Sequence, residues 1–193
     1  MAEVWNRYGG MPNQKDKALG LLNTVNQEFV NLVRATGGNN ARRYLLIAGY
    51  ATDIACTVDP AFKMPQDSAN HLMVSVHYYD PSVFTILEKD ADWGKAVYTW
   101  GTPDDVAKVK ADLLKVKTRF IDQGIPVVLG EFGCSGTKDP ASIHKYLTTV
   151  CETAHSLGLV PMLWDTGGIY DRQTCKFKDQ QLGEAFARIA GAP

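Results

Sequence analysis

The sequence has no Cys-x-x-Cys pair, no block of like charge and no apolar run of membrane-spanning length. Without a cysteine pair or closely spaced histidines, we expect no metal and no other cofactor. The formal net charge of -1 gives no bulk attraction to nucleic acid or anionic membranes. The longest apolar runs are strand-sized, whereas a membrane helix needs about 20 apolar residues. We therefore expect neither a nucleic-acid partner nor a membrane partner.

The four cysteines are Cys56, Cys134, Cys151 and Cys175. Cys151 falls on a predicted helix face and is expected to be a small core residue. The other three fall in predicted loops, where a disulfide and free thiols are both compatible with the sequence. The start, Met1–Asn6, lacks the charged-then-apolar pattern of a signal peptide, so localisation is not readable from this end.

Several motifs of common enzyme classes do not occur in this chain. No G-x-G-x-x-G or G-x-x-x-x-G-K-[ST] follows an apolar run, which argues against a nucleotide-binding protein. No G-x-S-x-G occurs either, which argues against a Ser-His-Asp hydrolase of the α/β type.

What is present fits a single α/β domain over residues 1–193. The composition is 45% hydrophobic and 21% charged, which is ordinary for a globular protein. Apolar runs bounded by Gly, Pro or Asn predict strands, and these alternate with predicted amphipathic helices. This alternation predicts a parallel sheet whose strands are joined by right-handed crossovers. The predicted strands are 44–48, 72–77, 126–131 and 159–164, the predicted helices are 15–36, 103–123, 140–157 and 179–190, and the predicted loops include 1–14, 49–70 and 80–102.

Chemically versatile side chains follow the predicted strands. Because parallel strands end at the same edge, we expect these residues to share one rim. Aromatic rings stack on the apolar faces of sugars, and carboxylates act at the anomeric carbon, so the set favours a carbohydrate site. Singly, each residue also has a structural interpretation, such as a Glu paired with a cation or a Trp filling the core. The strand-end residues are His77, Tyr79, Glu131, Trp164 and Asp165, and the following loops add Trp93, Tyr98, Trp100 and Tyr170.

Four segments give a more specific indication. They are Thr36–Asn40, His77–Pro81, Gly130–Gly133 and Leu163–Asp165. In order and spacing they resemble the last four strands of glycoside hydrolase family 5, the endoglucanase (cellulase) family with a (β/α)8 barrel. The resemblance implies a parallel (β/α)4 half-barrel, with a helix followed by four βα units over residues 15–193.

The resemblance also implies roles for individual residues. Glu131 matches the family's nucleophile, while His77 and Tyr79 match residues that line the −1 sugar site, with Tyr79 hydrogen-bonded to the nucleophile. Trp164 matches a sugar platform, and we expect Asp165 and Trp100 to contact substrate as well. The implied substrate is a β-1,4-glucan or cello-oligosaccharide, cleaved with retention by a secreted parent enzyme.

One element of the family pattern is missing. The family places its acid/base Glu in an Asn-Glu-Pro stretch, which does not occur here. The chain begins just past where that stretch is expected, and only weak substitutes, Asp80, Glu88 and Asp165, follow later. We therefore expect weak or no hydrolysis by the lone chain. The alternative is a non-catalytic self-assembling scaffold or glucan-binding module.

A four-stranded half-barrel would have two open edges and an uncovered apolar face. Unpaired edges and exposed apolar faces favour association. We therefore expect a homodimer or higher homo-oligomer, and a two-fold dimer would combine four strands with four strands.

Overall fold

The computed structural model describes residues 14–191, so nearly all of the predicted N-terminal loop lies outside the described residues. Gln14, placed in that loop by the sequence, already belongs to the first helix. The elements, in chain order, are α2 Gln14–Ala35, η1 Gly38–Ala41, β1 Leu45–Asp53, α3 Ile54–Thr57, β2 Leu72–Tyr78, α4 Ser82–Thr85, α5 Pro103–Arg119, η2 Ile121–Gln123, β3 Val127–Phe132, α6 Pro140–Ser156, β4 Val160–Leu163, β5 Tyr170–Asp171, β6 Lys176–Phe177 and α7 Gln180–Ile189.

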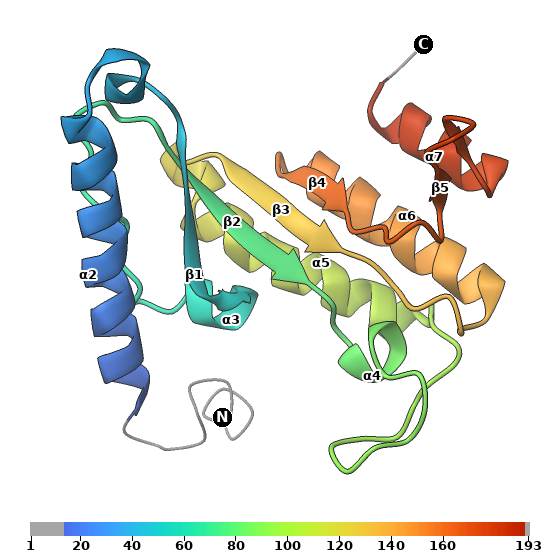
Figure 1. The fold of residues 1–193 in the computed structure, drawn as a ribbon. Helices are drawn as coiled ribbons and strands as arrows, with labels where there is room; N and C mark the ends of the chain where they lie inside the picture. The colour runs from blue at the N-terminus through green and yellow to red at the C-terminus, as the bar shows by residue number, and fades with distance from the viewer. Residues whose placement is uncertain (1–13, 192–193) are drawn as a thin grey trace.

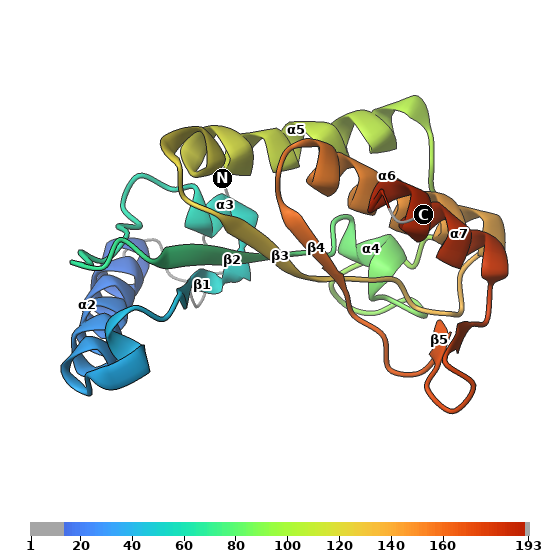
Figure 2. The same ribbon diagram turned by 90° about the horizontal axis from the view of Figure 1, so that it is seen from above.

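The main sheet has four strands in the order β1-β2-β3-β4, and every neighbouring pair is parallel. Figures 1 and 2 show α5 and α6 on one face of this sheet, while α2 stands beside the β1 edge. The predicted α/β class and the parallel arrangement are therefore confirmed. The strand ends at residues 77–79, 131–132 and 163–164 meet at one rim, as the sequence predicts.

The start of helix α5 is fixed by an N-terminal capping box. The hydroxyl of Thr102 accepts a hydrogen bond from the backbone N–H of Asp105, whose carboxylate accepts one from the backbone N–H of Thr102. Pro103 occupies the first turn, where a backbone N–H would have no helical partner. This capping box fixes the start of the helix that covers the centre of the sheet.

The core lies between the sheet and its helix layer. Val74 and Leu129, on the central strands β2 and β3, are both 0% exposed. Leu113 of α5 and Tyr146 of α6 are also fully buried in the same cluster. Burying such side chains contributes roughly 1.5–3 kcal/mol each to folding, so this face supplies most of the hydrophobic stabilisation.

Helix α2 has an apolar stripe that remains largely uncovered by the described residues. Leu21, Val25 and Leu32 are 64%, 54% and 69% exposed, although α2 buries Leu19 and Val30 completely or nearly so. The helical spacing predicted from these residues is confirmed. The stripe itself, however, faces away from the core that residues 14–191 form.

A bidentate ion pair attaches α2 to the loop before β2. Arg34 Nε and Nη2 donate to the two carboxylate oxygens of Asp67 at 2.8 and 2.9 Å. The same carboxylate accepts the backbone N–H groups of Ala69 and His71. The hydrogen bonds from Arg34 are the main reason that the pKa of Asp67 lies well below its usual range, and the two backbone donors lower that pKa further.

Several predicted loops contain regular structure. Strand β1 continues to Asp53 instead of ending at Ala48, and α3 follows it immediately. The loop 80–102 contains α4, and the last loop forms the antiparallel β5–β6 hairpin. These short elements lack the apolar periodicity by which longer ones are recognised.

All four cysteines are free. Cys151 is buried in α6, as predicted, and burial raises the pKa of its thiol to about 11. The prediction that Cys56 lies in a loop is wrong, because Cys56 lies in α3 and is fully buried. Across residues 14–191, no helix has the length and apolarity needed to cross a membrane.

Candidate active site

The candidate site is built on Glu131, near the C-terminal end of β3. Oxygen Oε2 of Glu131 accepts a hydrogen bond from the Tyr79 hydroxyl at 2.9 Å. The same oxygen lies 3.4 Å from Nδ1 of His77, and the Glu131 and His77 side chains are each 27% exposed. The structure thus brings together three side chains from two adjacent strand ends, in a place that is sheltered but open to solvent.

Tyr79 is suited to donate this hydrogen bond over a wide pH range. Its partial burial, followed by the hydrogen bond and the negative charge of Glu131, raises the pKa of the phenol above its usual value. The phenol therefore stays protonated at neutral pH and orients the carboxylate by donating to one oxygen.

Trp164 extends the site from the neighbouring strand end. Its backbone N–H donates to the carbonyl of Phe132 at 2.9 Å, which fixes it beside the end of β3. The side chain is 55% exposed. A Cβ on Gly133 would lie 3.1 Å from the Trp164 carbonyl and 3.7 Å from the Tyr79 ring, so a glycine permits this close approach. Trp164 consequently presents an exposed indole next to the Tyr79–Glu131 pair.

Asp165 organises a loop instead of presenting free oxygens. Its carboxylate accepts backbone N–H groups from Gly167, Ile169 and Tyr170 at 2.9–3.0 Å. Burial acts to raise the pKa of Asp165, but these backbone donors outweigh it and hold that pKa below the usual range. That Asp165 contacts substrate stays a prediction, and Asp165 lines the same cleft as Tyr79 and Trp164.

Trp100 is not at the rim, which corrects the prediction that it is a substrate contact. It is 7% exposed and packs in the core against Phe84 and Tyr146, with ring centroids 6.4 and 5.2 Å away. Trp93 and Tyr98, by contrast, are 59% and 50% exposed. A loop Trp with no periodic neighbours carries no sequence signal that separates a core position from a surface one.

A cleft of about 610 Å³ adjoins the site. Tyr79, Trp164 and Asp165 line it, and so does Glu88. Glu88 is engaged with the Ser135 hydroxyl, which donates to it at 2.8 Å. Glu131 and His77 do not line this cleft, so it extends the candidate site sideways without surrounding the carboxylate.

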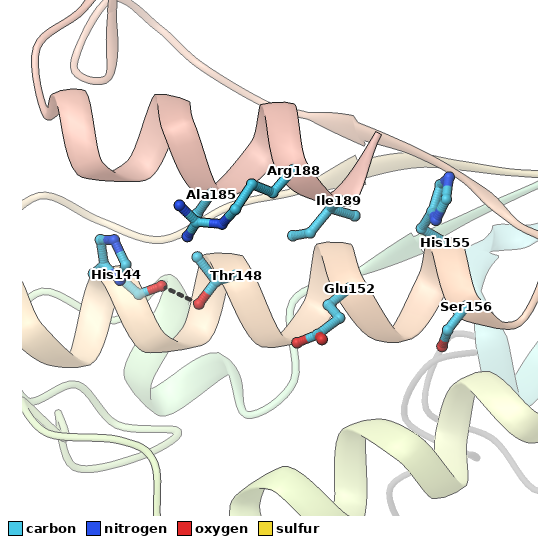
Figure 3. A pocket seen from close by; sticks show the side chains of 8 residues that line it. All are labelled: His144, Thr148, Glu152, His155, Ser156, Ala185, Arg188 and Ile189. Carbon is cyan, nitrogen blue, oxygen red and sulfur yellow. Dashed lines mark hydrogen bonds between the residues drawn. The ribbon is translucent and has the colours of Figure 1, made fainter. Parts of the chain in front are cut away.

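A second hollow of about 470 Å³ lies between α6 and α7 (Figure 3). Arg188 extends from α7 toward Thr148, whereas the Glu152 carboxylate points to the other side of α6. Thr148 Oγ1 donates to the carbonyl of His144 at 2.8 Å. The hollow has one carboxylate, that of Glu152, which points away from Arg188. It therefore lacks the pair of carboxylates that glycoside hydrolysis requires. In the described part of the chain, no three His, Cys, Asp or Glu side chains form a group that could hold a metal ion.

Sequence reasoning missed the two glycines that flank the carboxylate. The sequence pattern around Glu131 includes Gly130 and Gly133 but gives neither of them a function of its own. The structure shows that both stand where an added Cβ would meet a neighbouring strand or side chain. Their position on either side of a strand-end Glu was the available signal.

Comparison with known proteins now decides the family. The sequence model described as cellulase (glycosyl hydrolase family 5) matches residues 1–168. The chain belongs to glycosyl hydrolase family 5. It is 35% identical over 190 residues to Endoglucanase A of Paenibacillus barcinonensis, covering 86% of this chain and 46% of that protein. It is also 30% identical over 201 residues to Endoglucanase B of Clostridium cellulovorans, covering 99% of this chain and 43% of that protein.

Solved family 5 structures show the same relation. A broad-specificity endoglucanase from an uncultured bovine rumen ciliate superposes with a TM-score of 0.82 at 36% identity, covering 90% of this chain and 54% of that one. A family 5 lichenase from Caldicellulosiruptor, in complex with cellotetraose, also gives a TM-score of 0.82, at 29% identity, with 93% of this chain and 51% of that chain covered. The chain thus spans about half the length of its family 5 relatives, and its four parallel strands form half of a (β/α)8 barrel.

Proposed function

We propose that this chain carries the nucleophile half of a retaining β-1,4-glucan hydrolase site, with Glu131 as the nucleophile. The observation that carries the proposal is the arrangement at the rim. One oxygen of Glu131 is held by Tyr79 at 2.9 Å and approached by His77 at 3.4 Å, beside an exposed Trp164. A carboxylate that is held in one orientation but remains partly exposed can attack an anomeric carbon presented from solvent.

Each neighbour has a distinct part in this proposal. Tyr79 donates to Glu131 and holds the carboxylate in one orientation, which lowers the entropic barrier to attack. His77 borders the same oxygen and contributes to the wall around the reacting sugar. Trp164 offers an aromatic face on which the apolar face of a sugar ring stacks. The solved relatives include enzymes bound to cellotetraose, and a related Bacteroides ovatus enzyme is xyloglucan-specific, so a β-glucan is the substrate class we propose.

Retaining hydrolysis also requires a second carboxylate about 5–5.5 Å from the first, which protonates the leaving oxygen. The 193 residues contain no Asn-Glu-Pro stretch. Two of the three carboxylates suggested by the sequence as weak substitutes for this acid are already hydrogen-bonded. Asp165 accepts from backbone N–H groups, and Glu88 accepts from the Ser135 hydroxyl. We propose that the lone chain hydrolyses natural glucans weakly or not at all, because an unprotonated sugar oxygen is a poor leaving group.

We also propose that the chain associates with itself through its open face and strand edges. Leu46 and Tyr44 at the β1 edge are 49% and 56% exposed, and Val160 and Met162 of β4 are 50% and 52% exposed. A two-fold axis parallel to the strands would place β4 of one copy beside β1 of the other, with all strands running in the same direction. Four plus four strands would give the eight of a closed barrel.

A substrate that needs no acid tests the nucleophile directly. In 2,4-dinitrophenyl 2-deoxy-2-fluoro-β-cellobioside, dinitrophenolate departs without protonation. The bond from C1 to the phenolate oxygen breaks while a bond from C1 to a carboxylate oxygen of Glu131 forms. We expect one equivalent of dinitrophenolate and a fluorocellobiosyl ester on Glu131, located by peptide mass spectrometry.

The controls separate chemistry from simple binding. Glu131→Gln should abolish labelling, whereas Glu152→Gln, which changes a carboxylate on α6, should leave it unchanged. Labelling at another residue, or labelling that survives Glu131→Gln, would refute the proposal. If cellotetraose binds the chain in a titration while Glu131 is never labelled, the chain is instead a glucan-binding module.

A further inference from the structure

Strand β3 has one residue more than β2 just before the candidate nucleophile. Val76 of β2 pairs with Leu129 of β3, but the next residue of β2, His77, pairs with Glu131. Gly130 therefore has no partner position on β2. This is the two-against-one pairing of a β-bulge.

The same residue is extra with respect to β4. Leu129 pairs with Pro161, and the next pair is Phe132 with Leu163. From one pair to the next, β3 advances three residues while β4 advances two. A single additional residue in β3 accounts for both shifts. The bulge thus belongs to β3 and not to either of its neighbours.

The bulge decides which face of the sheet receives Glu131. Val127 and Leu129 face the helix-covered core and are 1% and 0% exposed, so regular alternation would send residue 131 to the same side. Instead Phe132, at 1% exposed, takes the next core position. One extra residue exchanges the two faces from that point onward, which puts Glu131 on the open face with His77.

The space around the bulge favours a glycine there. A Cβ on residue 130 would lie 2.9 Å from Ser75 Oγ and 3.4 Å from His77 Nε2. Gly130 is not among the residues with a left-handed backbone, so its conformation alone does not demand a glycine. An added methyl group would press directly on the Ser75 hydroxyl and would touch the ring of His77, whose strand partner is Glu131.

We propose that Gly130 is a positioning residue, which through its bulge and its missing side chain brings Glu131 against His77 and Tyr79. The inference rests on the proposed function of Glu131 and adds the device that orients it. Ser75 is the other half of this device, because its hydroxyl fills the space that a side chain at position 130 would need. Neither residue contacts the reacting sugar in this proposal.

The test compares four versions of the 193-residue chain: unmodified, Gly130→Ala, Ser75→Ala and the double variant. The first readout is the rate constant for labelling by the fluorinated dinitrophenyl cellobioside. Displacing a catalytic group by about 1 Å lowers rates roughly 100-fold, which is the loss we expect for Gly130→Ala. The double variant should recover to within about tenfold of the unmodified chain, and Ser75→Ala alone should label normally. Gly20→Ala, where the added Cβ meets nothing within 4 Å, is the matched control.

The second readout needs no catalysis. We expect a nuclear Overhauser contact between the His77 ring and the Glu131 side chain in the unmodified chain, lost in Gly130→Ala and regained in the double variant. If no chain is labelled but this contact follows that pattern, the positioning role stands and the nucleophile role fails. A contact and a labelling rate unaffected by Gly130→Ala overturn the positioning role. Should Gly130→Ala not fold, the double variant decides, because a folded double variant with the contact supports the role and an unfolded one refutes it.

Discussion

The two faces of the sheet are made from the same strands but differ in what covers them. On the face packed against α5 and α6, Val74 and Leu129 are fully buried. On the opposite face, Val160 and Met162 are about half exposed, and Glu131 lies among partly exposed side chains. The covered face therefore carries stability, while the open face carries the candidate chemistry and has apolar surface left over.

Truncating one leucine on each face tests this difference most strongly. Leu129→Ala should destabilise the chain by about 2–5 kcal/mol, because it leaves a cavity in a close-packed core. Leu46→Ala, at a side chain that is 49% exposed, should cost less than about 1 kcal/mol in the monomer. Urea unfolding followed by circular dichroism measures both. Equal losses at the two positions, measured at a concentration low enough for the chain to be monomeric, would contradict this difference between the faces.

Charge on the open face tests whether a second copy covers it. We expect light scattering to give the mass of a dimer for the unmodified chain at micromolar concentration. Met162→Lys should halve that mass, because burying an unpaired ammonium in an apolar interface is costly. Lys110→Glu, which changes a charge on the outer surface of α5, should leave the mass unchanged. A monomeric unmodified chain would contradict the proposed association.

The attachment of α2 at the sheet edge should depend on pH. Because Arg34 lowers the pKa of Asp67 in the folded chain, the pair stabilises folding above the unfolded-state pKa of about 4. That contribution is lost as the pH falls below this value toward the lowered folded-state pKa. Asp67→Asn should reduce stability at pH 7, and its difference from the unmodified chain should shrink in acid. Unfolding curves at pH 7, 4 and 3 measure this, and a difference that grows in acid would contradict it.

Much of the fold is readable from local sequence. The apolar run that ends in Gly130–Gly133 predicts β3 and places its carboxylate at the rim, and Thr102 with Pro103 predicts the start of α5. The grouping of Glu131 with His77 and Tyr79 follows because parallel strands end at one edge.

The remainder depends on contacts that no local pattern encodes. Burial of Trp100 requires Phe84 and Tyr146 to come from separate segments. The bulge at Gly130 is a matter of register between strands, and the period of the apolar residues does not show it.

The most direct test of the central claim is the intact mass of the chain after incubation with 2,4-dinitrophenyl 2-deoxy-2-fluoro-β-cellobioside. A single fluorocellobiosyl adduct, mapped to Glu131 and absent from Glu131→Gln, is the result we predict. An unmodified mass at saturating reagent, or an adduct that persists in Glu131→Gln, would contradict the assignment of Glu131 as the nucleophile.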